Sequence, residues 1–167
     1  MRPVFAVLAV GVLAFTAGAQ QAPPGCNSAA HRQFDFWVGD WTVTDSGRTV
    51  TYGSNLVTRE EDGCLVHEHW AGSKGGTGQS FNFYEPRTGK WEQVWVAQGG
   101  GNLHLVGAFD GRAMALKGES VSPQGTPQLD WAEWTPYPDG RVRQFWRQSA
   151  DGGKTWVVYF DGWYARR

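Results

Sequence analysis

The chain has 167 residues, and its 15 Lys and Arg against 16 Asp and Glu give a formal net charge of −1 at pH 7. This balance excludes the broad basic surface of a nucleic-acid-binding protein, and a hydrophobic fraction of 41% excludes general disorder. The length fits one domain. Ten tryptophans beside 23 glycines suggest large aromatic rings that pack over thin backbone.

The N-terminal segment has the pattern of a secretory signal peptide. Arg2 supplies a positive charge, residues 4–15 form an uncharged apolar run, and Ala17-Gly18-Ala19 gives a small-x-small cleavage site. The alternative is a membrane anchor, but the apolar run is too short to cross a bilayer. We therefore expect cleavage near Ala19, a periplasmic or secreted location, and no integral membrane segment after cleavage.

The chain has two cysteines, Cys26 and Cys64, and export would place both in an oxidising compartment. An oxidising compartment favours a disulfide between them. A catalytic or zinc-binding role needs thiolate-stabilising neighbours or further ligands, and the sequence offers neither nearby. The sequence thus predicts the disulfide Cys26–Cys64.

The remainder of the chain is predicted to be built of short strands. Residues 20–30 are expected to be a flexible lead-in, and residues 31–38 a short helical turn at the start of a domain that spans 31–167. After that turn, apolar–polar segments recur between turn sequences such as Asp62-Gly63, and no segment keeps a helical period. The predicted strands are 41–45, 50–58, 64–71, 78–84, 90–97, 102–109, 112–119, 128–135, 141–148 and 155–164.

This succession of strands predicts an all-β fold, a single antiparallel up-and-down β-barrel of about ten strands. A sheet of that size curls, and closure removes its exposed edges. Connections of hairpin length favour a barrel over a sandwich, and the absence of a repeated block disfavours a propeller.

Side-chain alternation assigns the inner face of the barrel. Arg141, Arg143 and Arg147 share one face of their strand, which must lie outside, so Gln144 and Trp146 point inward. The same reasoning in the other strands gives indoles mixed with amides, a hydroxyl and a carboxylate, a composition typical of small-ligand pockets. The predicted ligand-binding residues are Glu68, Trp70, Ser80, Asn82, Tyr84, Gln93, Trp95, Trp134, Gln144 and Trp146.

A filled core is the alternative to a ligand cavity, because buried polar groups can satisfy one another. A ten-stranded barrel is wide for side chains alone to fill, which favours the cavity. Glu68 is the candidate for acid or base catalysis, since burial between Val66 and Trp70 would raise its pKa. A structural Glu68 bonded by Ser80, Asn82 or Gln93 is the simpler interpretation. The sequence has no Ser-His-Asp order or nucleophile elbow.

The histidines are not predicted to hold a metal or haem. His67 and His69 alternate in one strand and point outward if Glu68 points inward. His104 is the least poor haem ligand, but Leu103 and Leu105 would take the inner face there. We therefore expect no metal and no cofactor.

Two motifs are interpreted as loop structure. Residues 149–156 (SADGGKTW) match the Asp-box of sialidase-like propellers, a hairpin device that occurs once in this chain without blade repeats. Residues 72–78 are glycine-rich but lack the Gly-Lys-Ser/Thr ending of a phosphate loop, so we expect a hairpin loop at the barrel mouth.

Several segments resemble a family of exported bacterial proteins of unknown function that are described as lipocalin-like. They are FDFWVGDW, GCLVHEHW, GQSFNFYEPRTGKWEQVWV and SADGGKTWVVYFDGWYAR, and the resemblance covers about residues 31–166. Gly39-x-Trp41 is similar to the Gly-x-Trp signature of calycins. The resemblance implies a calycin-type barrel in which Trp41 closes one end and packs on Arg166, and it implies no reaction.

These observations predict an exported lipocalin-like barrel that binds a small apolar or amphipathic ligand in its lumen, with no nucleic-acid partner. The alternatives are an enzyme on the same barrel with Glu68 as acid or base, and a filled structural barrel that acts through protein partners. The sequence does not indicate the ligand or the oligomeric state.

Overall fold

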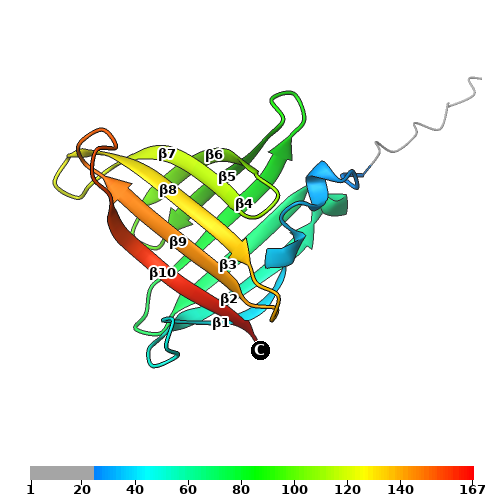
Figure 1. Cartoon of the computed structure of the whole chain (residues 1–167), viewed down its shortest axis with the longest axis horizontal. Helices are drawn as coiled ribbons and strands as arrows, with labels where there is room; N and C mark the ends of the chain where they lie inside the picture. The colour runs from blue at the N-terminus through cyan, green and yellow to red at the C-terminus, as the bar shows by residue number, and fades with distance from the viewer. Residues whose placement is uncertain (1–24) are drawn as a thin grey trace, which may run out of the picture.

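The computed structural model describes residues 25–167, which form a closed barrel of ten antiparallel strands (Figure 1). Each strand pairs with the next along the chain, and β1 pairs with β10 to close the sheet. The predicted all-β up-and-down barrel is confirmed. The strands are β1 Gly39–Thr44, β2 Thr51–Glu60, β3 Leu65–Gly72, β4 Thr77–Glu85, β5 Lys90–Ala97, β6 Asn102–Phe109, β7 Met114–Val121, β8 Pro127–Pro136, β9 Val142–Ser149 and β10 Val157–Arg166.

Every predicted strand has its counterpart in the barrel, with ends that differ by a few residues. The predicted signal peptide lies outside the described residues. Within residues 25–167, no helix is long and apolar enough to cross a membrane. The helical structure consists of three 3₁₀ turns, η1 Ala30–Arg32, η2 Asp35–Trp37 and η3 Glu61–Gly63.

The N-terminal 3₁₀ turns close one end of the barrel. Phe34 and Trp37 have no exposed surface, and their rings stack with centroids 4.9 Å apart. Phe34 also meets Trp91 of β5 edge-on, and Trp37 packs against Trp134 of β8. We call these four residues and Trp41 the plug cluster. The short helical turn predicted at 31–38 is confirmed, as the 3₁₀ turns η1 and η2. Since Phe34 and Trp37 fill this end of the barrel, the segment is also part of the core.

The disulfide and several polar contacts of residues 26–38, which we call the plug segment, lead to the β2–β3 connection. The predicted disulfide Cys26–Cys64 is present, with the two Cα atoms 4.8 Å apart. Arg59 of β2 donates to the carbonyl oxygens of Cys26 and Gly63 at 2.9 and 2.8 Å, and it pairs with Asp35. From Cys26 onward the lead-in is therefore held against the barrel.

Trp41 and Arg166 meet where the first and last strands join, as the resemblance implied. They are direct partners across β1 and β10, and the guanidinium carbon lies 4.4 Å from the indole centroid. The Trp41 Nε1 donates to the carbonyl oxygen of Trp37 at 2.9 Å, and Arg166 donates to that of Val38 at 3.1 Å. This cation–π pair therefore links the barrel seam to the plug segment.

The Asp-box motif is a hairpin device, as predicted. The Asp151 carboxylate accepts bonds from the backbone N–H groups of Lys154 and Thr155 at 3.0 and 2.9 Å. Trp156 lies against the turn, and its Nε1 donates to the Gly153 carbonyl oxygen at 3.1 Å. The motif stabilises the β9–β10 turn and contributes no side chain to the lumen.

Two glycines of the barrel make room for tryptophan rings. A Cβ atom at Gly53 would lie 2.9 Å from the Trp70 ring, and one at Gly78 would lie 2.3 Å from the Trp95 ring. Both distances are shorter than side-chain atoms tolerate. The indoles thus lie flat over bare backbone on neighbouring strands.

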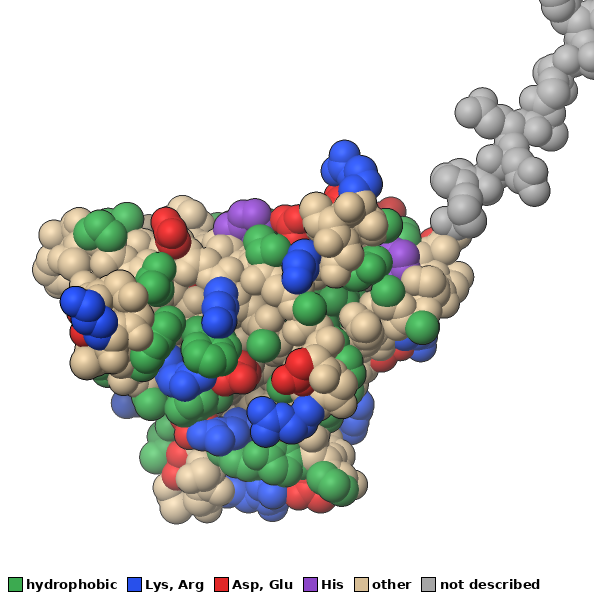
Figure 2. Space-filling model, turned by 45° about the horizontal axis from the view of Figure 1, so that its top comes forward, with side chains coloured by type: hydrophobic (Ala, Val, Ile, Leu, Met, Phe, Trp, Pro, Cys, Tyr) green, Lys and Arg blue, Asp and Glu red, His purple; other side chains and the backbone are tan. Residues whose placement is uncertain are grey.

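The outer face carries charges of both signs among hydrophobic side chains (Figure 2). Arg147 packs on the ring of Trp131 and pairs with Glu133, with 2.8 Å between nitrogen and oxygen. Arg143 pairs with Asp161 at 2.7 Å. The outward orientation predicted for the β9 arginines is confirmed.

We expect the double substitution Cys26→Ser and Cys64→Ser to lower the free energy of unfolding by about 3 to 4 kcal/mol. The bond closes a loop with a sequence separation of 38, so its loss increases the entropy of the unfolded chain. Urea unfolding followed by tryptophan fluorescence measures the change. A reductant should destabilise the wild type and leave the double variant unchanged; equal midpoints for the two proteins would refute the role given to the bond.

Candidate ligand-binding site

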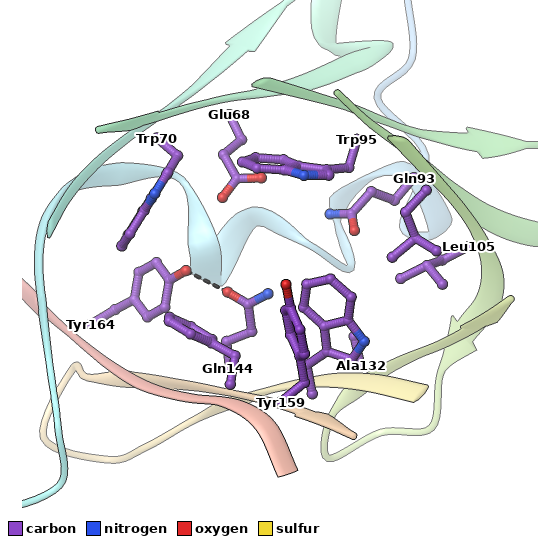
Figure 3. A pocket seen from close by; sticks show the side chains of 12 residues that line it. Glu68, Trp70, Gln93, Trp95, Leu105, Ala132, Gln144, Tyr159 and Tyr164 are labelled. Carbon is purple, nitrogen blue, oxygen red and sulfur yellow. Dashed lines mark hydrogen bonds between the residues drawn. The ribbon is translucent and has the colours of Figure 1, made fainter. Parts of the chain in front are cut away.

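A cavity of about 210 Å³ opens at the end of the barrel opposite the plug cluster. Its walls come from β3, β5, β6, β8, β9 and β10, and the side chains converge on a common space (Figure 3). Six of the predicted ligand-binding residues line it: Glu68, Trp70, Gln93, Trp95, Gln144 and Trp146. The barrel is filled at one end and hollow at the other, so the filled-core alternative describes only one half of it.

The other four predicted residues point inward but do not line the cavity. Ser80 and Asn82 are fully buried behind Glu68 and Gln93, where they bond to them. Tyr84 packs near Trp91, and Trp134 packs in the plug cluster against Phe34 and Trp37. Side-chain alternation correctly predicted that these residues face the barrel interior, but it does not predict how far along the barrel axis each of them lies.

The sequence prediction omitted six lining residues. Leu103, Leu105, Ala132, Phe160 and Tyr164 follow the same inward alternation as the predicted set and could have been included. Tyr159 could not, because β10 has a register shift between Val158 and Phe160 that interrupts the alternation. Its ring lies 4.4 Å from that of Trp146 and covers part of the mouth of the cavity.

A chain of hydrogen-bonded polar side chains runs along the inner wall from β2 to β5. Glu68 accepts bonds from Asn55 Nδ2 at 2.7 Å and from Ser80 Oγ at 2.6 Å. Asn82 donates to Ser80 Oγ at 2.8 Å, and Gln93 donates to Asn82 Oδ1 at 2.8 Å. We call these five residues the polar belt. Most of its donors are paired, as buried polar groups require.

Tyr164 connects the polar belt to the plug cluster and to the opposite wall. Its ring lies edge-on to those of Trp37 and Trp41, with centroids 6.3 and 6.2 Å apart. Its hydroxyl accepts from Asn55 at 3.4 Å and donates to Gln144 Oε1 (Figure 3). Burial raises the pKa of Tyr164 well above its ordinary value, so this hydroxyl remains protonated and keeps donating.

Glu68 is the one carboxyl group among the residues that line the cavity, and it is 5% exposed. Desolvation by burial raises its pKa to about 7, against the opposing effect of the bonds from Ser80 and Asn55. The group therefore changes between its neutral and charged forms near neutral pH. The sequence predicted that Ser80, Asn82 or Gln93 would hydrogen-bond to Glu68, and Ser80 does so. The second hydrogen-bond partner of Glu68 is Asn55, which the sequence analysis did not identify.

A second buried acidic residue, Asp130 of β8, lies on the inner face of the barrel and holds a cavity residue in place. It accepts bonds from Trp146 Nε1 at 2.7 Å and from Gln148 Nε2 at 2.9 Å, and it pairs with Ser120. These bonds orient the Trp146 indole toward the lumen. Asp130 shares the inward alternation of Ala132 and Trp134, so the strand pattern could have identified it.

The histidines lie outside the barrel, as predicted from the orientation of Glu68. His67 and His69 share the outer face of β3, with ring centroids 4.0 Å apart. With Glu60 they place one potential metal-ligand atom each within 4.8 Å of the others. His104 also faces outward and bonds to Glu92 at 2.9 Å. None of these groups reaches the cavity, whose described lining contains no histidine.

The site thus combines apolar and aromatic walls with a few oriented polar groups, which suits non-covalent binding of a small molecule. Its volume of about 210 Å³ is somewhat larger than the roughly 150 Å³ that holds benzene in an engineered protein cavity. A ligand of one or two rings is the size that fits. A scan of protein-family models and a search of curated proteins found no match for this chain.

We expect the stability of the wild type to fall, relative to the Glu68→Gln variant, as pH rises from about 4.5 to 7. In this range the unfolded chain ionises Glu68 while the folded protein keeps its proton, so the raised pKa stabilises the fold at low pH and ceases to do so above pH 7. The change amounts to about 3 kcal/mol.

Urea unfolding at several pH values between 4 and 8 measures this difference. Glu119→Gln, at an exposed position of β7, is the matched control and should run parallel to the wild type. A wild-type curve parallel to that of Glu68→Gln would show that the carboxyl ionises normally.

Proposed function

We propose that this protein is an exported, lipocalin-like barrel that binds a small, mostly apolar ligand in its lumen. The observation that carries the proposal is the cavity of about 210 Å³, which persists inside a barrel whose other end is filled with aromatic rings. Tightly packed protein interiors contain few spaces of this size. Leu103, Leu105 and the lumen tryptophans supply apolar surface, and Glu68, Gln93 and Gln144 would orient the ligand.

Two observations support export and the family resemblance. The disulfide Cys26–Cys64 is of the kind that persists in oxidising compartments such as the periplasm or the extracellular space. The Trp41–Arg166 pair is the contact that the resemblance to calycins implies. We therefore propose a periplasmic or secreted binding protein with a cleaved signal peptide.

The pKa of Glu68 near 7 favours a second candidate function, acid or base chemistry on a bound molecule. Its carboxyl group borders the cavity, as proton transfer to a ligand requires. Loss of turnover in Glu68→Gln with retained binding would support this candidate. Binding is the main proposal because the cavity itself carries it, whereas acid or base chemistry depends on the single carboxyl group of Glu68.

Substitution of Ala132 by Phe is expected to abolish ligand binding by occupying the cavity. Ala132 is 1% exposed and lines the lumen, so the added ring takes the space of a one-ring ligand. Titration of the wild type with toluene and naphthalene should give a saturable change in tryptophan fluorescence, since Trp70, Trp95 and Trp146 surround the site. Ala132→Phe should weaken binding at least tenfold.

Ala71→Phe, which adds the same ring at an exposed position of β3, is the control and should bind like the wild type. Native mass spectrometry of protein purified from its source should also detect a bound small molecule. If the wild type shows no saturable response to apolar compounds and retains no bound mass, the binding function is refuted.

A further inference from the structure

The cavity lining contains an acidic residue and no basic one. Glu68 is an acid, and none of the twelve lining residues is Lys, Arg or His. A ligand with a carboxylate or phosphate group would have to bury its charge beside Glu68 without a cation to balance it, which is unfavourable in a desolvated site. This arrangement disfavours fatty acids and other anions.

Glu68 and Gln93 leave hydrogen-bond acceptor positions open at the inner end of the cavity. A carboxylate offers about four acceptor positions, and the protein uses two at Glu68 for Asn55 and Ser80. Gln93, which also lines the cavity, donates through Nε2, and its Oε1 accepts no bond from residues 25–167. The lining also holds donors, the amide nitrogen of Gln144 and the indole N–H groups of Trp70 and Trp95. At Glu68 and Gln93 the open positions are acceptors, so the inner end of the cavity suits a ligand group that carries hydrogen-bond donors.

Aromatic rings surround the Glu68 carboxylate. Trp70 comes from the same strand, Trp95 lies beside the carboxylate, and Tyr164 faces it across the lumen (Figure 3). Electron-rich ring faces attract cations, and tryptophan is the most effective of them. Rings and a carboxylate around one space form a site for an organic cation.

We propose that the lumen binds a small aromatic amine, with its ammonium group at the Glu68 carboxylate and its ring among Trp70, Trp95 and Trp146. This inference rests on the proposed binding function and specifies the class of its ligand. An ammonium group supplies three donors and the positive charge that the lining lacks. The cavity of about 210 Å³ leaves room for one or two rings and a short linker.

Binding of such an amine should depend on pH through Glu68. Its pKa of about 7 means that the amine binds the ionised form, so affinity rises from pH 6 to pH 8 and binding at pH 6 releases a proton. The amine itself stays charged over this range.

Few other ionisable groups act on Glu68. Tyr164 faces it from β10 and remains protonated, and His67 lies on the outer side of the same strand. Asp130 of β8 accepts hydrogen bonds from Trp146 and Gln148. The partners on β2 and β4, Asn55 and Ser80, do not ionise.

The test compares three ligands of similar shape on the disulfide-intact protein by isothermal titration calorimetry at pH 8. They are 2-phenylethylamine, its neutral counterpart 2-phenylethanol and the anion 3-phenylpropionate. The amine should bind at least tenfold more tightly than the alcohol, and the anion more weakly than both. Its affinity should fall at pH 6, with proton release that appears as a buffer-dependent enthalpy.

Glu68→Gln should weaken amine binding at least tenfold, to the level of the alcohol, whereas the surface control Glu119→Gln should not change it. Circular dichroism establishes that both variants fold, and the wild-type ligand series tests the proposal without any variant. If toluene or 2-phenylethanol binds as tightly as the amine, or more tightly, the amine proposal is wrong and the binding function stands. If no compound binds, both are wrong.

Discussion

The width of a ten-stranded barrel explains both the packed end and the hollow end of this protein. Such a barrel encloses more space than its own inward side chains fill. The segment before β1 fills this space at one end only, because its residues Phe34 and Trp37 enter the barrel and complete a packed cluster of rings. The remaining width at the other end is the cavity, so its position follows from which end the N-terminal segment occupies.

The polar belt lies where packed rings give way to open lumen. A carboxyl group buried in a wholly apolar core would be costly, and one in open solvent would ionise normally. Glu68 lies between these environments, with hydrogen bonds from Asn55 and Ser80 and little exposed surface. Its raised pKa is therefore a consequence of its depth in the barrel. Tyr164 joins the two regions, since its ring contacts the plug cluster and its hydroxyl bonds to the cavity residue Gln144.

Much of this arrangement was predictable from strand alternation. The arginine face of β9 identified the outside, and the inward orientation of Glu68, Gln93 and Trp146 followed from the same rule. The positions of Ser80 and Trp134 were not predictable in the same way. Both face inward as expected, yet one is buried behind Glu68 and the other lies in the plug cluster. Alternation distinguishes two faces and contains no information on distance along the axis.

The strand order, the inner face, the turns and the cysteine pair could be predicted from the sequence, because they follow from local periodicity, turn chemistry and the expectation of an oxidising compartment. Which inward residues share a cavity could not be predicted in this way. Strand register, the β10 irregularity at Tyr159 and the insertion of Phe34 and Trp37 set the depth of each side chain. These are relations between segments far apart in the chain, and they arise only when the barrel closes.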